Sequence, residues 1–254
     1  MGFGLFRPRT LLDEPSVEWM FDVFSWALRN LDAEVFRRHT ILVTPSNEHF
    51  PGWVESPEGM ARLIFERVAH YAGMAHWPLR LTSQQGCYPD FNPGGHLPGP
   101  LRGIGLPSVD APQPFPVVYD PHQARDPQVL IATLAHTLAE RLGRVAPEAA
   151  PGGEENWSHV VELLAVFMGF GLMFANSAYV APKGGCGSCG PGVQRHAFLS
   201  QYHVTYALAI FAELKGIPAG EVVAHLKRPL RGFFRKARKE IAGGTRLQAL
   251  RALL

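Results

Sequence analysis

A long apolar run in the second half of the chain constrains the fold more than any other feature. It extends from Leu163 to Tyr179 and directly follows Glu162. The run is shorter than the ~20 residues that a helix needs to cross a bilayer, and Gly169 and Gly171 interrupt it. We therefore predict a helix that is buried on all sides in a protein core, and no transmembrane segment.

Helical periodicity dominates the chain beyond Asp126, whereas the first part mixes helices with short β segments. Helices are predicted at 126–143, 157–178, 199–215, 219–226 and 228–241, and earlier at 17–31, capped by Ser16, and at 57–74, capped by Ser56. Strands are predicted at 40–44, 77–82 and 117–119, with a long irregular stretch at 85–115. We expect one α+β domain over residues 1–254, with a mixed α/β half up to residue 125 and a helical half from residue 126.

The number of cysteines and the composition of the N-terminal segment indicate the cellular compartment of the protein. Three cysteines among 254 residues form no disulfide framework, which favours a reducing environment. The residues before Asp13 lack the sustained apolar stretch of a signal peptide. A cytoplasmic protein is therefore expected.

Positive charge is concentrated near the C-terminus. Between His225 and Leu254 nine Lys or Arg residues accompany one acid, Glu240, although the formal net charge of the chain is only +2. As a helix, 228–241 would be amphipathic, and it would suit an acidic protein partner or another acidic surface. The alternative is a solvated face whose Phe233 and Phe234 point into the core. Nucleic acid is not expected as a partner, because the overall charge is nearly balanced.

The helix predicted after Asp126 carries a candidate metal site. His136 and Glu140 are four residues apart, so their side chains leave the same helix face one turn apart. This spacing lets one helix offer two ligands to a single metal ion. Glu162, at the beginning of the apolar helix, is the predicted third ligand, and the ion is a divalent metal, with zinc the first choice.

The layout resembles the zincin metallopeptidases, which carry His-Glu-x-x-His on one helix and, in the gluzincin branch, a Glu on a later helix. More narrowly, the chain resembles a poorly characterised group of bacterial zincin-like proteins over about residues 40–230. The segments that carry this resemblance are TPSNEHFPGW, ARLIFERVAHYAGM, ELLAVFMGFGLMFANSAY and FLSQYHVTYALAIFAEL. The resemblance implies a zincin-like helix pair around a metal and no particular substrate.

Two departures from the zincin motif limit the chemistry. Thr137 stands where a zincin has its general-base Glu, and Glu140 stands where it has its second His. A threonine hydroxyl does not take a proton from metal-bound water as a carboxylate does. We therefore predict a zincin-like metal-binding protein that is a pseudoprotease or a hydrolase with altered chemistry. In the active version His159 is the proton carrier, and no phosphate loop or dinucleotide fingerprint predicts an organic cofactor.

Two other interpretations of the same residues are open. Glu140 would pair with Arg141 or Arg144, and His136 would then be a half-buried histidine with its hydrogen bonds satisfied. Alternatively His159, three residues before Glu162, joins the other three side chains in a cluster of two imidazoles and two carboxylates. Such a cluster suits manganese or iron better than structural zinc.

A Cys-x-x-Cys pair lies in a glycine-rich segment. Cys186 and Cys189, together with His196 and Cys87, make a candidate structural zinc site that would staple this segment to the domain. Free thiols and a redox pair are the alternatives, although no helix N-terminus is evident to activate a thiol. A non-catalytic scaffold or binding protein with this zinc staple is the alternative function.

Overall fold

Helices form most of the structure, which is a computed structural model that describes residues 10–83, 99–111, 113–178 and 197–254. The first half holds α1 (Glu14–Asn30), α2 (Ala33–Arg38), α3 (Pro57–Tyr71), β1 (Leu79–Ser83) and β2 (Phe115–Tyr119). The second half holds α4 (Pro127–Arg144), α5 (Trp157–Ala165), α6 (Gly171–Ser177), α7 (Gln201–Lys215), α8 (Ala219–His225), α9 (Arg228–Ile241) and α10 (Thr245–Arg251). The α+β class, with a small sheet in the first half and a helical second half, is confirmed.

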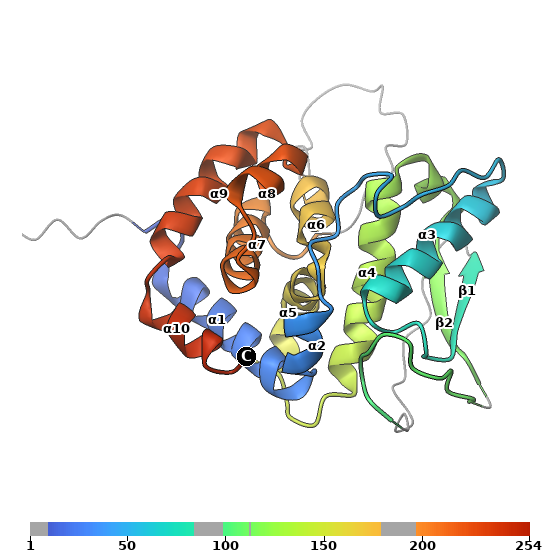
Figure 1. Cartoon of the computed structure of the whole chain (residues 1–254), viewed down its shortest axis with the longest axis horizontal. Helices are drawn as coiled ribbons and strands as arrows, with labels where there is room; N and C mark the ends of the chain where they lie inside the picture. Colours follow the sequence, from blue (N-terminus) through green and yellow to red (C-terminus); the bar gives the residue numbers. More distant parts are fainter. Residues whose placement is uncertain (1–9, 84–98, 112, 179–196) are drawn as a thin grey trace, which may run out of the picture.

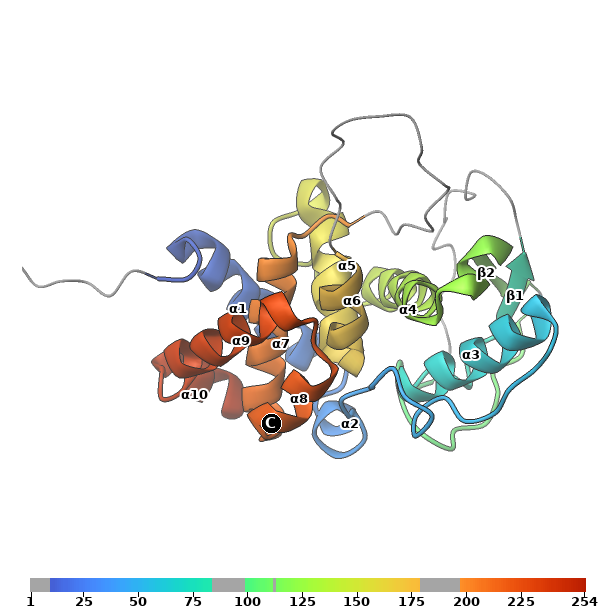
Figure 2. The same ribbon diagram turned by 90° about the horizontal axis from the view of Figure 1, so that it is seen from above.

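The helices α4, α5 and α6 occupy the middle of the molecule in both views (Figures 1 and 2). On one side lie α3 and the two strands, and on the other lie α7 to α10. Although α1 begins the chain, it packs against α5 and α10. An ion pair between Glu14 and Arg246, and a 3.2 Å hydrogen bond from the Leu11 N–H to the Glu240 carboxylate, join the two ends of the described chain.

The sheet consists of β1 and β2, which pair in parallel with Leu79 opposite Phe115. The strands predicted at 77–82 and 117–119 are thereby confirmed, with boundaries shifted by a few residues. The predicted N-cap of the first helix is wrong by three residues. Asp13, not Ser16, is the cap, because its carboxylate accepts the Ser16 N–H at 2.9 Å.

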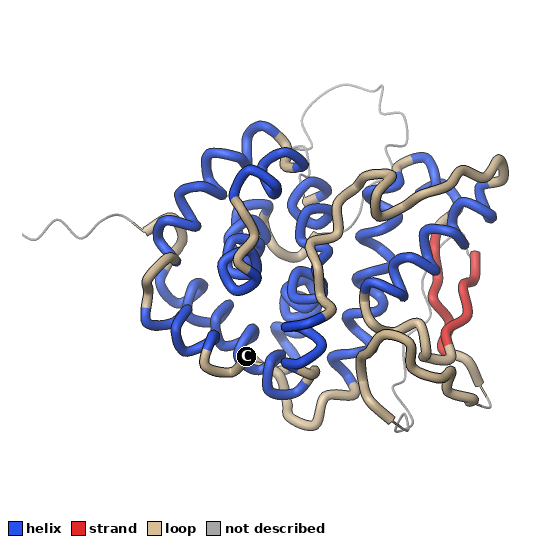
Figure 3. The backbone as a smooth tube through the Cα atoms, in the orientation of Figure 1, coloured by secondary structure: helices blue, strands red, loops and turns tan. Residues whose placement is uncertain are grey.

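The strand predicted at 40–44 is wrong. This segment is extended, but in the described part of the chain it joins no sheet and runs as a loop across the centre of the molecule (Figure 3). Its backbone contact is with the apolar helix: the Val43 N–H donates to the Gly169 carbonyl at 3.0 Å. The apolar side chains of Leu42 and Val43 are therefore buried against a helix and not in a sheet, while Ile41 is exposed.

The apolar run is buried as predicted but is not one continuous α-helix. A π-helical turn, Val166–Phe170, separates α5 from α6, and Gly169 within it has φ 100° and ψ 0°. Of the described residues, Glu154–Ser177 is the one stretch long and apolar enough to cross a membrane, and 89% of its apolar window is buried in the fold. It is the core helix of the structure, and the described residues contain no clear membrane span.

A buried cation that sequence reasoning missed ties an irregular segment to the core. Arg102 is only 1% exposed, and it donates to the Ala72 carbonyl at 2.9 Å and to the Thr40 hydroxyl at 3.0 Å. Burial lowers its pKa to about 10. Its guanidinium also lies 5.7 Å from the centre of the Phe167 ring. Arg102 thus connects residues 99–111 with the end of α3 and with the 40–44 segment.

We predict that Gly169→Ala destabilises the fold by at least about 2 kcal/mol, because it adds left-handed backbone strain to a steric clash. A Cβ at this position would lie 2.1 Å from the Ile41 carbonyl oxygen. Urea unfolding measures the effect. Gly232→Ala in α9 is the control, because its Cβ meets nothing within 4 Å and it should stabilise the helix by up to about 1 kcal/mol. Equal stability of the Gly169→Ala variant and the wild type would contradict the clash.

Candidate functional site

The predicted metal ligands lie on the adjacent helices α4 and α5. His136 and Glu140 share a half-buried face of α4, while Glu162 in α5 is fully buried. Over the described residues, no three His, Cys, Asp or Glu side chains are grouped so that they could hold one metal ion. The structure therefore confirms the helical spacing of the pair on α4, and the metal site itself stays a prediction.

Both carboxylate oxygens of Glu162 bind the backbone that leads into α7. Oε1 accepts the Phe198 N–H at 3.3 Å, and Oε2 accepts the Leu199 N–H at 2.8 Å. A fully buried carboxylate needs such donors, because burying it without partners is costly. Glu162 therefore fixes the two residues that precede Ser200, the N-cap of α7.

Phe198 stands between the two imidazoles that sequence analysis singled out. Its ring centre is 6.1 Å from that of His136, in a stacked arrangement, and 6.2 Å from that of His159, edge to face. The two histidines thus both pack against one aromatic ring. The predicted cluster of two imidazoles and two carboxylates stays a prediction.

The predicted pairing of Glu140 with Arg141 or Arg144 is not found among the described ion pairs. Arg144 pairs with Glu154 at 2.5 Å instead. Arg141 is buried, and its guanidinium donates to the Pro116 carbonyl. Burial lowers the pKa of Arg141 to about 10, against an opposing effect of Glu140. Thr137, at the position of a zincin's general base, donates its hydroxyl to the Thr133 carbonyl at 3.2 Å within the helix.

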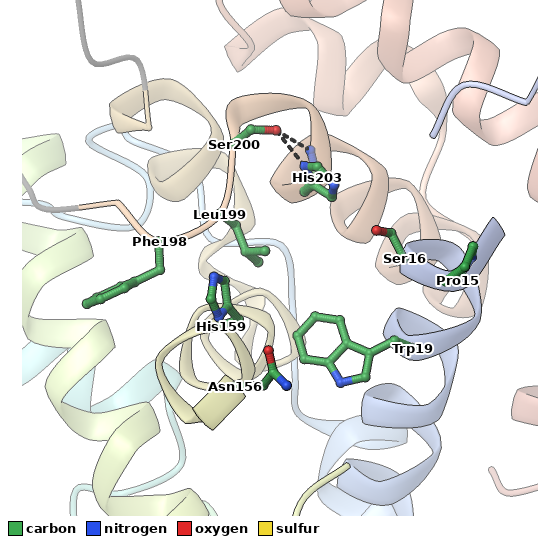
Figure 4. A pocket seen from close by; sticks show the side chains of 9 residues that line it. All are labelled: Pro15, Ser16, Trp19, Asn156, His159, Phe198, Leu199, Ser200 and His203. Carbon is green, nitrogen blue, oxygen red and sulfur yellow. Dashed lines mark hydrogen bonds between the residues drawn. The ribbon is translucent and has the colours of Figure 1, made fainter. Parts of the chain in front are cut away.

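A cleft of about 540 Å³ opens where the first turns of α1, α5 and α7 meet (Figure 4). Three helices contribute polar groups from their N-terminal ends, and two aromatic side chains form apolar walls. The lining residues are Pro15, Ser16, Trp19, Asn156, His159, Phe198, Leu199, Ser200 and His203. Asn156 and Ser200 are the N-cap residues of α5 and α7. We define this space as the three-helix cleft.

The two imidazoles are the only titratable side chains among the described residues that line the three-helix cleft. His203 Nδ1 lies 2.6 Å from the Ser200 hydroxyl, which also accepts the His203 backbone N–H at 3.3 Å. Burial lowers the pKa of His203 from 6.5; nearby Asp13 opposes this shift and His159 adds to it. His203 is therefore less readily protonated than a free imidazole.

His159 occupies the opposite wall of the three-helix cleft, between Trp19 and Phe198. Its ring centre is 6.5 Å from the Trp19 ring, edge to face. The Nδ1 atom is buried and has no hydrogen-bond partner in the described part of the chain. Trp19 is held in place by a 3.1 Å hydrogen bond from its indole N–H to the Pro151 carbonyl. The cleft thus offers two imidazole groups, one of which lies between two aromatic side chains.

The electrostatics of the three-helix cleft combine three helix N-termini with one nearby carboxylate, that of Asp13. The N-terminus of a helix carries a partial positive charge, and three such ends meet here, with the Ser16 N–H bound by the Asp13 carboxylate and the His203 N–H bound by the Ser200 hydroxyl. No carboxylate, lysine or arginine is among the lining residues that the structure describes. Protonation of an imidazole would add a full positive charge. The arrangement can therefore accept an anionic group and take up a proton with it.

Sequence reasoning named His159 as a proton carrier but missed the cleft around it. Trp19 and Ser200 were not singled out as site residues, and His203 was considered only as a second imidazole for the zinc site of the cysteine pair. A signal existed for Ser200, because serine is a preferred N-cap residue at the start of a helix. The candidate zinc staple of Cys87, Cys186, Cys189 and His196 lies outside the described residues.

Comparison with protein-family models, with curated proteins and with solved structures finds no match for the chain. The resemblance to zincin-like proteins therefore stays a prediction.

We predict that Glu162→Gln lowers the free energy of unfolding by about 1–3 kcal/mol. An amide has one acceptor oxygen, so its NH₂ group would face one of the two backbone N–H groups of Phe198 and Leu199. Chemical denaturation measures the change, and Glu140→Gln, on the half-buried face of α4, is the matched control. Equal stability of the two variants would show that Glu162 does not anchor the segment before α7.

Proposed function

We propose that the chain is a binding protein whose three-helix cleft takes a small ligand with an anionic group, such as a carboxylate, phosphate or sulfonate. The observation that carries this proposal is the meeting of three helix N-termini with His159 and His203 in one cleft. The volume of about 540 Å³ suits a small molecule. This proposal belongs to the class of non-catalytic binding proteins, and a cytoplasmic location is part of it.

The aromatic walls add a second feature of the ligand. Trp19 and Phe198 offer apolar surface beside the imidazoles, so an aromatic or aliphatic body attached to the anionic group gains burial. The imidazoles and helix ends would hold the anion, because hydrogen bonds to charged groups are the stronger ones. We therefore favour a ligand with a short apolar body over a bare inorganic anion.

The proposal predicts tighter binding at low pH. The pKa of His203 is below its ordinary value in the free protein, and an anion beside the ring raises it, so binding takes up a proton. We expect benzenesulfonate, whose charge is the same at pH 6 and pH 8, to bind about tenfold more tightly at pH 6. Isothermal titration calorimetry in buffers of different ionisation enthalpy measures both the affinity and the proton uptake.

Two variants make this measurement specific. His203→Gln should remove most of the pH dependence, whereas His70→Gln, an exposed histidine on α3, should leave it unchanged. Equal affinity at pH 6 and pH 8, or unchanged binding in a His159→Gln, His203→Gln double variant, would contradict the anion site. Weaker binding of sulfate than of benzenesulfonate is expected from the aromatic walls.

A second candidate function is the zincin-like metal-binding protein predicted from the sequence, either a pseudoprotease or an altered hydrolase. One observation favours it: His136 and Glu162 both contact Phe198, from α4 and α5 respectively. The ion would be zinc, or manganese or iron if His159 takes part. The described side chains do not by themselves form a group for one ion, so we derive no chemical step through a metal.

Metal analysis of the purified protein tests this candidate. Comparison of the wild type with His136→Ala and Cys189→Ser separates the two predicted sites. Loss of one equivalent only in His136→Ala supports the site on α4 and α5, and loss only in Cys189→Ser supports the cysteine staple. Absence of stoichiometric metal from all three samples would contradict both sites.

A further inference from the structure

The basic segment near the C-terminus forms a one-sided helix whose charges face solvent. The apolar side of α9 packs against α7, and Leu230, Phe234, Ala237 and Ile241 are buried. Phe234 is buried, as in the predicted alternative in which the phenylalanines of this segment point into the core. Phe233 is only half-buried. The charged side of α9 therefore faces solvent and can contact a partner, whereas its apolar side is buried against α7.

Six cations on or next to α9 have no carboxylate partner among the described residues. By contrast, Arg238 pairs with Glu213, and Arg246 in α10 pairs with Glu14. The one acid of the helix, Glu240, accepts hydrogen bonds from the Tyr206 hydroxyl and the Leu11 N–H. The six cations are Lys227, Arg228, Arg231, Arg235, Lys236 and Lys239. We define them as the α9 basic face.

Helix geometry aligns these cations along one ridge. At 3.6 residues per turn, Arg228, Arg235 and Lys239 lie opposite the buried side, with Arg231 and Lys236 flanking them. A helix of 14 residues is about 20 Å long. Lysine and arginine side chains on such a face neutralise phosphates, and this charge neutralisation supplies most of the sequence-independent binding of nucleic acids. The α9 basic face thus presents about 20 Å of positively charged helix surface to the phosphates of a polyanion.

An aromatic pair lies where α7 and α9 meet. Tyr202 is 44% exposed, and its ring centre lies 5.0 Å from that of Phe233. Exposed aromatic rings beside a basic groove or ridge are the usual platform on which unpaired bases stack. Tyr202 therefore offers a contact for a base in addition to the phosphate contacts of the α9 basic face.

Two other kinds of partner fit these observations less well. A helix that lies in a lipid surface buries its apolar side in the bilayer, but the apolar side of α9 is buried against α7. Among polyanions, a single-stranded nucleic acid is the one whose bases stack on an exposed aromatic ring, so Tyr202 favours it over an acidic peptide. The small net charge of the whole chain, which argued against nucleic acid, hides this local concentration of charge.

We propose that the α9 basic face binds single-stranded nucleic acid through its phosphates, with Tyr202 stacking on a base. The inference does not depend on the three-helix cleft, because no residue of the α9 basic face lines that cleft. The proposed binding surface is the face of α9 that points away from α7.

Fluorescence anisotropy with a labelled oligothymidylate tests the proposal in the full-length protein. The affinity should fall as salt rises, with a slope of about −0.7 in log K against log salt for each phosphate neutralised. The triple variant R228Q/R235Q/K239Q should bind at least about tenfold more weakly at low salt, and its slope should be smaller by about 2. Tyr202→Ala should weaken binding by about fivefold or more.

A matched charge control uses the opposite side of the molecule. The variant R62Q/R67Q/R80Q removes three exposed arginines from α3 and β1, and it should bind as the wild type does. Circular dichroism confirms that each variant is folded. The same loss in both triple variants, or no binding at low salt, would overturn the proposal. So would competition by polyglutamate or by phosphatidylserine vesicles as effective as that by unlabelled oligothymidylate.

Discussion

The buried carboxylate of Glu162 is the interaction on which the candidate site depends. Its two oxygens hold the backbone N–H groups of Phe198 and Leu199, and these residues lead directly into the N-cap of α7. His159 lies one turn before Glu162 on α5, and His203 lies in the first turn of α7. One buried side chain therefore sets how the two imidazoles face each other across the three-helix cleft.

The apolar helix that carries Glu162 is positioned by a second constraint. At Gly169 the backbone turns through a positive φ, and the 40–44 segment approaches so closely that a Cβ would collide with the Ile41 carbonyl. The π-helical turn separates α5, whose first turns build the cleft, from α6, which packs on α4 and α7. Packing of the core and geometry of the cleft are therefore consequences of the same interrupted helix.

Much of the local structure was predictable from sequence, and the long-range contacts were not. Asp126 and Pro127 predicted the start of α4, and the apolar run predicted the buried helix, because these signals depend on neighbouring residues. The sequence of the 40–44 segment predicts a strand, but its Val43 N–H donates a hydrogen bond to the Gly169 carbonyl of a helical turn far along the chain. Likewise, helix periodicity placed His136 and Glu140 on one face, whereas the partners of Glu162 lie 36 and 37 residues further on. The spacing of residues along one helix predicts which side chains share a face of that helix. It does not predict which groups from other segments contact those side chains.

The central claim, that His159 and His203 form one anion-binding site, is tested most directly by the ¹H–¹⁵N spectrum of the imidazole rings during a titration with benzenesulfonate near pH 6.5. The account predicts that the ring nitrogens of these two histidines shift together, with one saturation curve and toward the protonated form. Exposed histidines such as His39 and His70 should not follow that curve. Unchanged His159 and His203 resonances at saturating ligand would contradict the account.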